Sequence, residues 1–530
     1  MGRWLEGWRD LVVGARFLRD LPGHLRRPPL TVGEARAEVS RRLARRSDDL
    51  LRLVAAEVAA RPRGLSASLL AHAGCEAGDL ERSVRADGVE GALAGLLRSG
   101  VYLTGDEFKG RVAVRRGSAT FEGGPDAIRN PRARFHVALR SSGSRGAGTP
   151  VLLDLAFVCD QAATTLAAYS AWGVDRASLA TWEVPGGGAL FRLLEFARMA
   201  QRPERWFSHL SLAEPSLHPR YRRSARALVW GSWLSGVALP APVHAPYDDP
   251  APIVDWFAET IRRGGTPLLF GFPSSAVRIA ETALARSIDL AGGWVVVSGE
   301  PSTATRLATI RSAGLAPIVR YGSIETGALG YLCRHATRPD ELHRLDDLHG
   351  FVHVETDSVE GLPRGAILVT SLRPSAPFLF LNTSMGDRAE RATGACGCAL
   401  EQLGWRERIH TVRSFEKLTG AGMTFRDADL IELLERELPQ RFGGGPSDWQ
   451  LVEDESPSGA PRIRLLVDPG AGSFDAVEAR SAFLAGLAAA SPAAQTMSLV
   501  WRDAGLPEIE RRPPLRARTG KVLHLYVDRT

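Results

Sequence analysis

Short apolar runs alternate with segments of helical periodicity through the middle of the chain, and no other feature of the sequence limits the fold as strongly. The apolar runs are 268–270, 294–297 and 317–319, and the helical segments are 192–200, 252–263, 275–289 and 302–313. Strands that alternate with helices usually form a sheet covered on both faces, so each strand is apolar along its whole length. Two further apolar runs, 351–354 and 367–370, predict more β-structure. We therefore predict an α/β fold with a large, multi-layer domain and buried sheets.

The two ends of the chain differ from this central region. Apolar residues recur at helical spacing over 32–58, which predicts an amphipathic helix, and helical character continues to about residue 98. Beyond residue 412 the predicted elements are a helix over 427–437, strands over 449–452 and 463–467, and a helix over 475–490. We predict a large N-terminal domain, 1–412, that starts with a mostly helical extension, 1–98, and a small α+β C-terminal domain, 413–530.

Composition excludes several classes of protein. The formal net charge is only +6 over 530 residues, and no block of like charges resembles a nucleic-acid-binding arm. No apolar run is long enough for an ordinary transmembrane helix. The N-terminal stretch lacks the apolar core of a signal peptide, and the five cysteines form no disulfide framework of a secreted protein. We expect a cytoplasmic protein with no nucleic-acid partner.

A serine- and glycine-rich loop spans residues 141–150 and includes Ser141, Ser142, Gly143 and Ser144. Glycine lets backbone N–H groups turn towards an anion, and hydroxyl groups donate to phosphate oxygens, so this loop is a candidate phosphate cradle. It is not a P-loop of the GxxxxGK[ST] type, because no lysine follows its last glycine. A flexible connection is the alternative interpretation.

Four more motifs follow this loop in a fixed order. They are Ser298-Gly299-Glu300-Pro301, Tyr321-Gly322-Ser323-Ile324-Glu325, Met385-Gly386-Asp387-Arg388 and Thr519-Gly520-Lys521. The first two come directly after predicted strands, and open α/β sheets bind their ligands at the carboxyl ends of strands. We therefore expect these motifs to form a ligand site together with the loop.

With these motifs in this order, the chain resembles the acyl-adenylate-forming superfamily, which includes acyl-CoA synthetases and peptide-synthetase adenylation domains. The likeness is greatest to the phenylacetate–CoA ligase-like branch and covers about residues 95–530. It implies a mobile C-terminal domain and an ATP- and Mg²⁺-dependent ligase. Such an enzyme converts a small-molecule carboxylic acid into an acyl-AMP, releases pyrophosphate and passes the acyl group to a thiol, here with coenzyme A as the leading candidate.

The resemblance also implies roles for individual residues. The implied nucleotide site consists of Ser141, Ser142, Gly143, Ser144, Gly299, Glu300, Pro301, Tyr321, Gly322 and Asp387. Within it, Tyr321 would stack on adenine and Asp387 would accept both ribose hydroxyls. Glu325 would hold the Mg²⁺ ion that bridges the ATP phosphates, and Lys521 would reach the site from the C-terminal domain.

The chemistry gives a second reason to single out Lys521. An attacking carboxylate and the α-phosphate are both anions, so the reaction needs cations aimed at the charge that they share. Mg²⁺ supplies one cation, and lysine, a compact charge on a flexible stem, suits the other task. Only three of the 66 lysine and arginine residues are lysines, which makes each a candidate for a place where arginine cannot substitute.

The chain departs from the family pattern in two places. Arg145 and an Ala147-Gly148 insertion change the phosphate loop, and the hinge between the domains, usually Gly-Arg-x-Asp, reads Val412-Arg413-Ser414-Phe415-Glu416. The sequence therefore supports the adenylation step better than the transfer step. Two alternatives stay open: acyl transfer to a carrier-protein thiol or an amine, and a non-catalytic nucleotide- or acyl-binding relative.

The cysteines near the Gly-Asp motif are candidate metal ligands. Cys396 and Cys398 flank one glycine, Cys333 lies upstream, and the resemblance favours His343 over His335 as a fourth ligand. A Cys₃His set is typical of structural zinc, because four protein ligands leave no open position for chemistry. Ordinary buried cysteines are the alternative, since the one-residue spacer is shorter than usual.

We expect the acyl group to lie between the phosphate loop and the strand that ends at Tyr321. The candidate wall residues are Phe270, Gly271, Phe272 and Ser298. Further candidates, with core packing as the alternative, are Trp230, Trp233 and Trp256. This aromatic and glycine content suits an aryl acid or an extended apolar acid such as a fatty acid.

Overall fold

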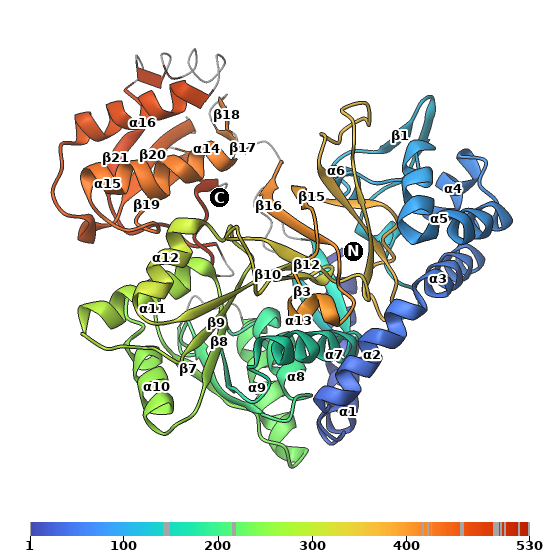
Figure 1. Ribbon diagram of the computed structural model, residues 1–530, viewed down its shortest axis with the longest axis horizontal. Coiled ribbons are helices and arrows are strands. Elements are labelled where there is room, and N and C mark those ends of the chain that lie inside the picture. Colours follow the sequence, from blue (N-terminus) through green and yellow to red (C-terminus); the bar gives the residue numbers. More distant parts are fainter. Residues whose placement is uncertain are drawn as a thin grey trace.

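The computed structural model contains two separate sheet units, and the smaller one, in orange to red, lies at the upper left of Figure 1. The larger unit has a sheet of twelve strands and the smaller a sheet of four, counted over the part of the chain that the structure describes. The described residues are 2–140, 149–214, 219–415, 418–420, 423–425, 427–455, 461–490, 498, 501–502, 505–517 and 520–527.

Helices occupy the N-terminal region, as predicted. They are α1 (Gly2–Leu25), α2 (Val32–Ala44), α3 (Arg46–Ala60), α4 (Leu65–His72), α5 (Ala77–Arg98) and the short α6 (Gly105–Phe108). Thr31 caps α2, because its hydroxyl accepts from the backbone N–H of Glu34 while the Glu34 carboxylate accepts from the N–H of Thr31. The single helix predicted over 32–58 is wrong: the chain leaves helical geometry at Arg45, and α2 and α3 are two helices.

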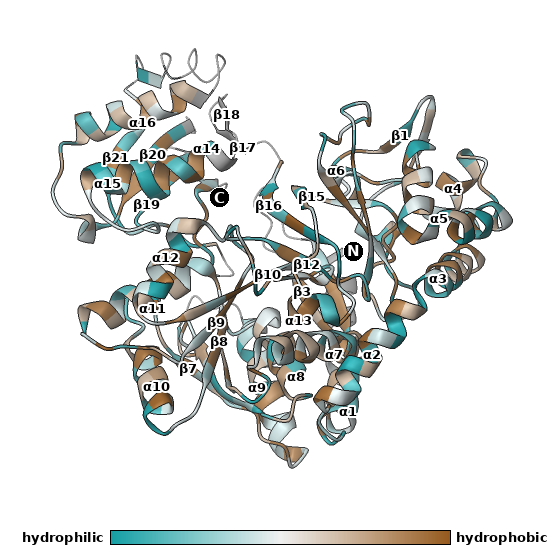
Figure 2. Cartoon of the chain, viewed as in Figure 1, coloured by the Kyte–Doolittle hydropathy of each residue, from teal (hydrophilic) through white to brown (hydrophobic). Residues whose placement is uncertain are grey.

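The parallel half of the large sheet carries the strand-ending motifs. In spatial order its strands are β10 (Ala316–Ser323), β9 (Trp294–Ser298), β8 (Pro267–Gly271), β5 (Ser178–Trp182), β6 (Pro203–Ser208) and β7 (Pro242–His244). Strands β8 and β9 are apolar along nearly their whole length, as Figure 2 shows at the centre of the molecule. This confirms the predicted α/β fold.

Helices cover both faces of the parallel strands. One face packs on α7 (Leu155–Trp172) and α8 (Gly187–Phe196), with Phe270, Val296 and Ile318 in the contact. The other face packs on α10 (Ala251–Arg262), α11 (Pro273–Ala285) and α12 (Ala304–Ser312). Successive residues of one strand therefore point to opposite layers of the molecule.

The other half of the large sheet is antiparallel and continues from β10. In spatial order its strands are β11 (Gly327–Leu332), β12 (Leu342–Arg344), β16 (Arg408–Ser414), β15 (Thr383–Ala392), β14 (Ala366–Ser371) and β13 (His349–His353). The remaining elements of this unit are β1 (Val114–Arg116), β2 (Ala119–Phe121), β3 (Phe135–Arg140), β4 (Pro150–Asp154), α9 (Pro219–Leu234) and α13 (Ala399–Gln402). β3 and β4 pair as a hairpin around the serine- and glycine-rich loop.

The smaller unit has its own sheet and core. Its strands, in spatial order, are β21 (Glu508–Arg511), β20 (Pro461–Val467), β19 (Trp449–Glu455) and β22 (Leu525–Val527). Its other elements are β17 (Leu418–Gly420), β18 (Met423–Phe425), α14 (Asp427–Glu432), a π-helical turn η2 (Leu433–Glu437), α15 (Leu438–Phe442) and α16 (Ala476–Ala490). The predicted boundary at 412/413 stays a prediction; β16 of the large sheet continues to Ser414.

Across the described residues, no helix combines the length and the apolar character needed to cross a membrane.

Candidate functional site

The motifs expected to form one site meet at the carboxyl edge of the parallel strands. Ser298 is the last residue of β9. Tyr321 and Gly322 lie near the carboxyl end of the neighbouring strand β10. Glu325 follows in the tight connection to β11. The phosphate-loop candidates Ser141–Ser144 lie outside the described residues, so their placement stays a prediction.

Lys521 reaches this edge from the smaller unit. A Cβ atom added to Gly299 would lie 3.0 Å from both Cε and Nζ of Lys521, and Nζ lies 5.6 Å from the ring centroid of Phe272. Gly299 also has φ +85°, a conformation that other residues rarely adopt. A glycine is therefore required at position 299 for the lysine to take this place.

Four carboxylates interact electrostatically with the ammonium group of Lys521. Burial lowers the pKa of Lys521, and Glu300, Glu325, Glu183 and Asp387, in decreasing order, act against that shift. Charges interact strongly where water is excluded, so these carboxylates favour the charged form of Lys521.

The carboxylate of Glu300 is already saturated with donors. It accepts from the Ser274 N–H at 3.0 Å and hydroxyl at 2.9 Å, from Arg306 Nη1 at 3.0 Å and from the Val522 N–H at 2.9 Å. Val522 directly follows Lys521. Glu300 therefore holds the lysine segment against the large sheet, which differs from the nucleotide contact that the resemblance implied.

Glu325 is the contrasting carboxylate. Its side chain is only 7% exposed, yet it forms no hydrogen bond or ion pair with any residue that the structure describes. Carboxylate oxygens are the ligands that Mg²⁺ prefers, and a protein usually supplies only one or two of them while phosphates supply the rest. The free acceptor capacity of Glu325 fits the role of a magnesium ligand.

Tyr321 and Asp387 lie together, as the resemblance implied. The Tyr321 hydroxyl donates to Asp387 Oδ2 at 2.9 Å, and burial together with the nearby carboxylate raises the pKa of Tyr321. Asp387 lies on β15, in the antiparallel half of the sheet. An aromatic ring and a carboxylate side by side fit the recognition of a nucleoside, with the ring for the base and the carboxylate for hydroxyl groups.

A buried ionic network that sequence reasoning missed joins the two units. Arg306 on α12 forms ion pairs with Glu300 at 3.0 Å and with Glu435 of η2 at 2.7 Å, and His524 lies 2.6 Å from the same Glu435 oxygen. Burial alone would raise the pKa of Glu435, but Arg306 and His524 outweigh it and lower the pKa. No local signal could have found the whole network, because Arg306 and His524, which both contact Glu435, lie 218 positions apart.

The acyl-site candidates fall into two groups. Phe270, Gly271, Phe272 and Ser298 all lie at the carboxyl edge of β8 and β9, beside the lysine segment. The tryptophans do not join them. Trp230 and Trp233 are 64% and 63% exposed on α9, and Trp256 packs in the core against Phe257 and Phe207. The structure thus separates the tryptophans from the other four candidates: α9 packs on α1, and Trp256 packs in the core, which was the alternative interpretation.

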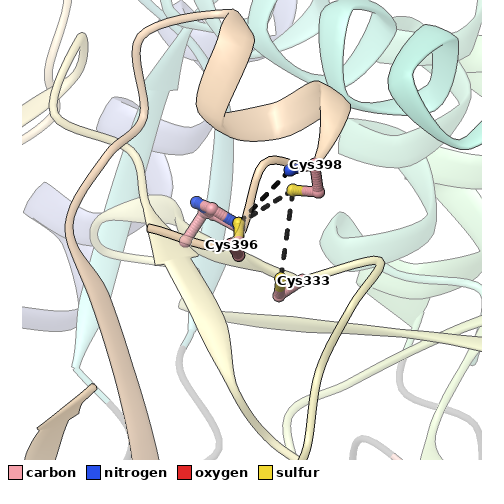
Figure 3. A group of neighbouring side chains, drawn as sticks. Cys333, Cys396 and Cys398 are labelled. Atoms are coloured by element: carbon pink, nitrogen blue, oxygen red, sulfur yellow. Dashed lines mark hydrogen bonds between the residues drawn. The ribbon is translucent and has the colours of Figure 1, made fainter. Parts of the chain in front are cut away.

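The four predicted metal ligands come together. Figure 3 shows the sulfur atoms of Cys333, Cys396 and Cys398 close to one another. His343 Nε2 lies 3.4 Å from the sulfur of Cys396 and 3.2 Å from that of Cys398, and the sulfurs of Cys333 and Cys398 are 3.9 Å apart. The ligands of a tetrahedral zinc ion lie about 3.5 to 3.8 Å from one another. The cluster therefore has the ligand set and the size of a structural zinc site.

The surroundings of the cluster orient its ligands. His343 Nδ1 lies 2.5 Å from the Trp405 carbonyl oxygen, so Nδ1 donates and Nε2 is left to bind a metal. Gly397 has φ +67°, which lets the chain turn sharply enough for Cys396 and Cys398 to face the same point despite the one-residue spacer. His343, rather than His335, is the histidine of the cluster, as predicted.

Comparison with known proteins identifies the fold. No family model and no curated protein matches the sequence. A crystal structure of 2-hydroxyisobutyryl-CoA ligase in the postadenylation state with R3-HIB-AMP is similar at a TM-score of 0.52 and 15% identity, over 91% of this chain and 89% of that one. The same ligase with 2-HIB-AMP gives 0.52 and 14%, over 95% and 92%. At this identity the likeness shows the fold, and the chain has the fold of the acyl-adenylate-forming ligases.

Proposed function

We propose that this chain is an ATP- and Mg²⁺-dependent ligase that joins a carboxylic acid to AMP and releases pyrophosphate. The observation that carries the proposal is the place of Lys521. Its ammonium group lies against Gly299, at the strand edge that also presents Tyr321 and the carboxylate of Glu325, which has no hydrogen-bond or ion-pair partner among the described residues. A non-catalytic binding protein would not need a half-buried lysine aimed at this point.

The residues divide the work of adenylation between them. Lys521 would contact an oxygen of the attacking carboxylate and an oxygen of the α-phosphate, and so stabilise the charge that develops between them. Glu325 would hold Mg²⁺, which supplies positive charge to the phosphates when bound. Tyr321 and Asp387 would fix the base and the ribose, and Ser141–Ser144 would bind the phosphates, so that the α-phosphate faces the acid.

The acceptor of the acyl group is a second part of the proposal. A 2-hydroxyisobutyryl-CoA ligase shares the fold, which favours the thiol of coenzyme A as the acceptor. Transfer to a carrier-protein thiol or to an amine is the alternative, because the hinge motif of the family is altered at Val412–Phe415. The two differ in a simple measurement: only in the first does coenzyme A accelerate release of AMP.

The cysteine cluster completes the proposed cofactor set. Cys333, His343, Cys396 and Cys398 would hold one Zn²⁺ ion in a closed, four-ligand site. Such a site stabilises the antiparallel half of the sheet and takes no part in the reaction.

Exchange of labelled pyrophosphate into ATP, measured with a panel of carboxylic acids, tests the adenylation step. We expect exchange with at least one acid and a loss of about 10²- to 10³-fold in Lys521→Ala, since removing one donor to a developing charge typically costs that much. Lys109→Ala is the matched control, because Lys109 follows α6 outside the site and should leave the rate unchanged. Absence of exchange with every acid, or a rate unaffected in Lys521→Ala, would contradict the proposal.

A further inference from the structure

Arg320 is a buried arginine at the strand position directly before Tyr321. Its side chain is 6% exposed, and the pairing of β10 with β9 places it opposite Ser298. Nη1 of Arg320 lies 3.4 Å from Ser298 Oγ, and its guanidinium carbon lies 6.0 Å from the ring centroid of Phe270. The guanidinium group therefore contacts two of the residues against which the acyl group is proposed to lie.

The hydrogen-bonding capacity of this guanidinium is almost unused. Arginine has five N–H donors. Among described residues, the long contact to Ser298 is its one hydrogen bond, Nε is buried without a partner, and no carboxylate forms an ion pair with it. The buried Arg306, in contrast, is paired with two carboxylates. A buried charge without a counter-ion is costly, so the position of Arg320 calls for an anion that binds there.

The neighbouring charged groups do not supply that anion. Arg192 on α8 lies 3.6 Å above the ring centroid of Phe270 and forms its own ion pair with Glu195. Glu183, which follows β5, accepts from the Thr181 hydroxyl at 2.7 Å and forms an ion pair with no described residue. Burial raises the pKa of Glu183, although Arg192 and Arg320 oppose this shift. Among the described residues, neither Glu183 nor Glu195 comes within ion-pair distance of Arg320.

We propose that the acid activated by this chain carries a second carboxylate at the far end of its acyl group, and that Arg320 binds this second carboxylate. The inference rests on the adenylation function proposed above and names the substrate class for the same site. The planar guanidinium offers two parallel N–H groups that match the two oxygens of a carboxylate. Phe270 would pack on the carbon skeleton between the two carboxylates, and the Ser298 hydroxyl would add a donor to the bound group.

This substrate class differs from the aryl or fatty acid that the sequence predicted. That prediction used Phe270, Phe272 and the glycine between them and overlooked the charged residue in an otherwise apolar strand. An acid with an apolar end would displace water from Arg320 and leave its donors unpaired. Sites built to hydrogen-bond one substrate group reject the analogue that lacks it by about 10⁴- to 10⁵-fold.

Matched acids test the proposal directly. The wild-type chain is assayed by pyrophosphate exchange with linear dicarboxylates from succinate to suberate, each against the monocarboxylate of the same length, and with 4-carboxyphenylacetate against phenylacetate. We expect at least one dicarboxylate to exceed its partner in kcat/KM by about 10²-fold or more. In Arg320→Met the ratio of the two kcat/KM values should fall to near one. The dicarboxylate loses its partner for the second carboxylate, and the monocarboxylate no longer leaves buried N–H donors unpaired.

The ratio between two acids is informative even if the variant loses activity through misfolding, since a purely structural defect lowers both rates alike. Arg320→Lys, which keeps the charge but not the paired donors, should retain part of the preference. Equal rates within every pair in the wild type, or a ratio unchanged in Arg320→Met, would overturn this inference and leave adenylation intact. Absence of exchange with any acid would overturn the proposed function and this inference together.

Discussion

The cysteine cluster and the Lys521 site are both assembled from distant segments, but different forces hold them in place. Cys333 directly follows β11, and His343 lies on β12, which pairs with β11. The cysteine cluster therefore forms when this one sheet forms. Lys521 comes from the segment before β22 of the small sheet and meets the large sheet through Val522–Glu300 and Arg306–Glu435. The cysteine cluster is thus a property of one unit, whereas the lysine site exists only while the two units are docked.

Removing the metal should have the largest effect and should act on stability alone. Apparent binding free energies of structural zinc are about 10 to 16 kcal/mol in small zinc domains, so loss of the ion should lower the unfolding temperature by many degrees. We expect elemental analysis to find one equivalent of zinc in the wild type and much less in Cys398→Ser. At temperatures where the variant stays folded, its adenylation rate should remain close to that of the wild type.

A matched cysteine variant makes this test specific. Cys75 lies outside the cluster on the helical N-terminal region, so Cys75→Ser should keep both the zinc and the unfolding temperature. Much less than one equivalent of zinc in the wild type would refute the metal site.

Breaking the buried ionic network should weaken the docking of the two units and leave the stability of each unit unchanged. Arg306→Met leaves Glu300 and Glu435 without their shared cation, and removing one partner of a buried pair typically costs about 3 to 5 kcal/mol. We expect the Val522 amide, which Glu300 holds in the docked form, to exchange its hydrogen at least about 100-fold faster. The adenylation rate should fall with it, because Lys521 then leaves the site.

Arg286→Met is the control for the loss of an arginine. Arg286 pairs with Asp255 on the surface of α10, with both side chains exposed, and such pairs contribute little. Amide exchange at Val522 that is equal in Arg306→Met and Arg286→Met would show that the network does not hold the units together.

The sequence predicted what is local and missed what depends on packing between segments. The strand ends at Ser298 and Tyr321 could be located because apolar runs and glycine-containing turns are contiguous signals. The cysteine cluster could also be predicted, because cysteine and histidine are rare enough for four of them to suggest one site.

The missed features have no contiguous signal. The network of Arg306, Glu435 and His524 arises from the docking of two units. Nothing in the sequence distinguishes a buried arginine from the other arginines, of which the chain has 63. The exposed Trp230 and Trp233 mislead for the opposite reason, because large apolar residues are usually buried. Arg320 is intermediate: a charge inside a buried strand is a detectable exception, and a search for such exceptions would have found it.

The smallest expected effect is a pH dependence of docking at a second contact between the units. On α11, Arg278 Nη1 lies 3.1 Å from Glu281, and the same guanidinium lies 3.5 Å from Asp448 and 3.1 Å from Asp468 of the smaller unit. Burial and the nearby Asp448 raise the pKa of Glu281 to about 7, although Arg278 opposes this shift. One arginine is then shared among three carboxylates, and docking is favoured while Glu281 is protonated.

The sign of this dependence follows from the raised pKa. The stabilising contribution of Glu281 is fully present below its ordinary pKa of 4.5 and is lost as the pH rises through about 7. After correction for intrinsic exchange, we expect the hydrogen of the Val522 amide to exchange about tenfold faster above pH 7 than below pH 4.5. A tenfold change corresponds to a shift of one pKa unit. Glu281→Gln, which stays neutral, should remove the dependence while leaving the Arg306 network closed. The same pH dependence in wild type and Glu281→Gln would assign it to another group, and docking would then rest on Arg306 alone.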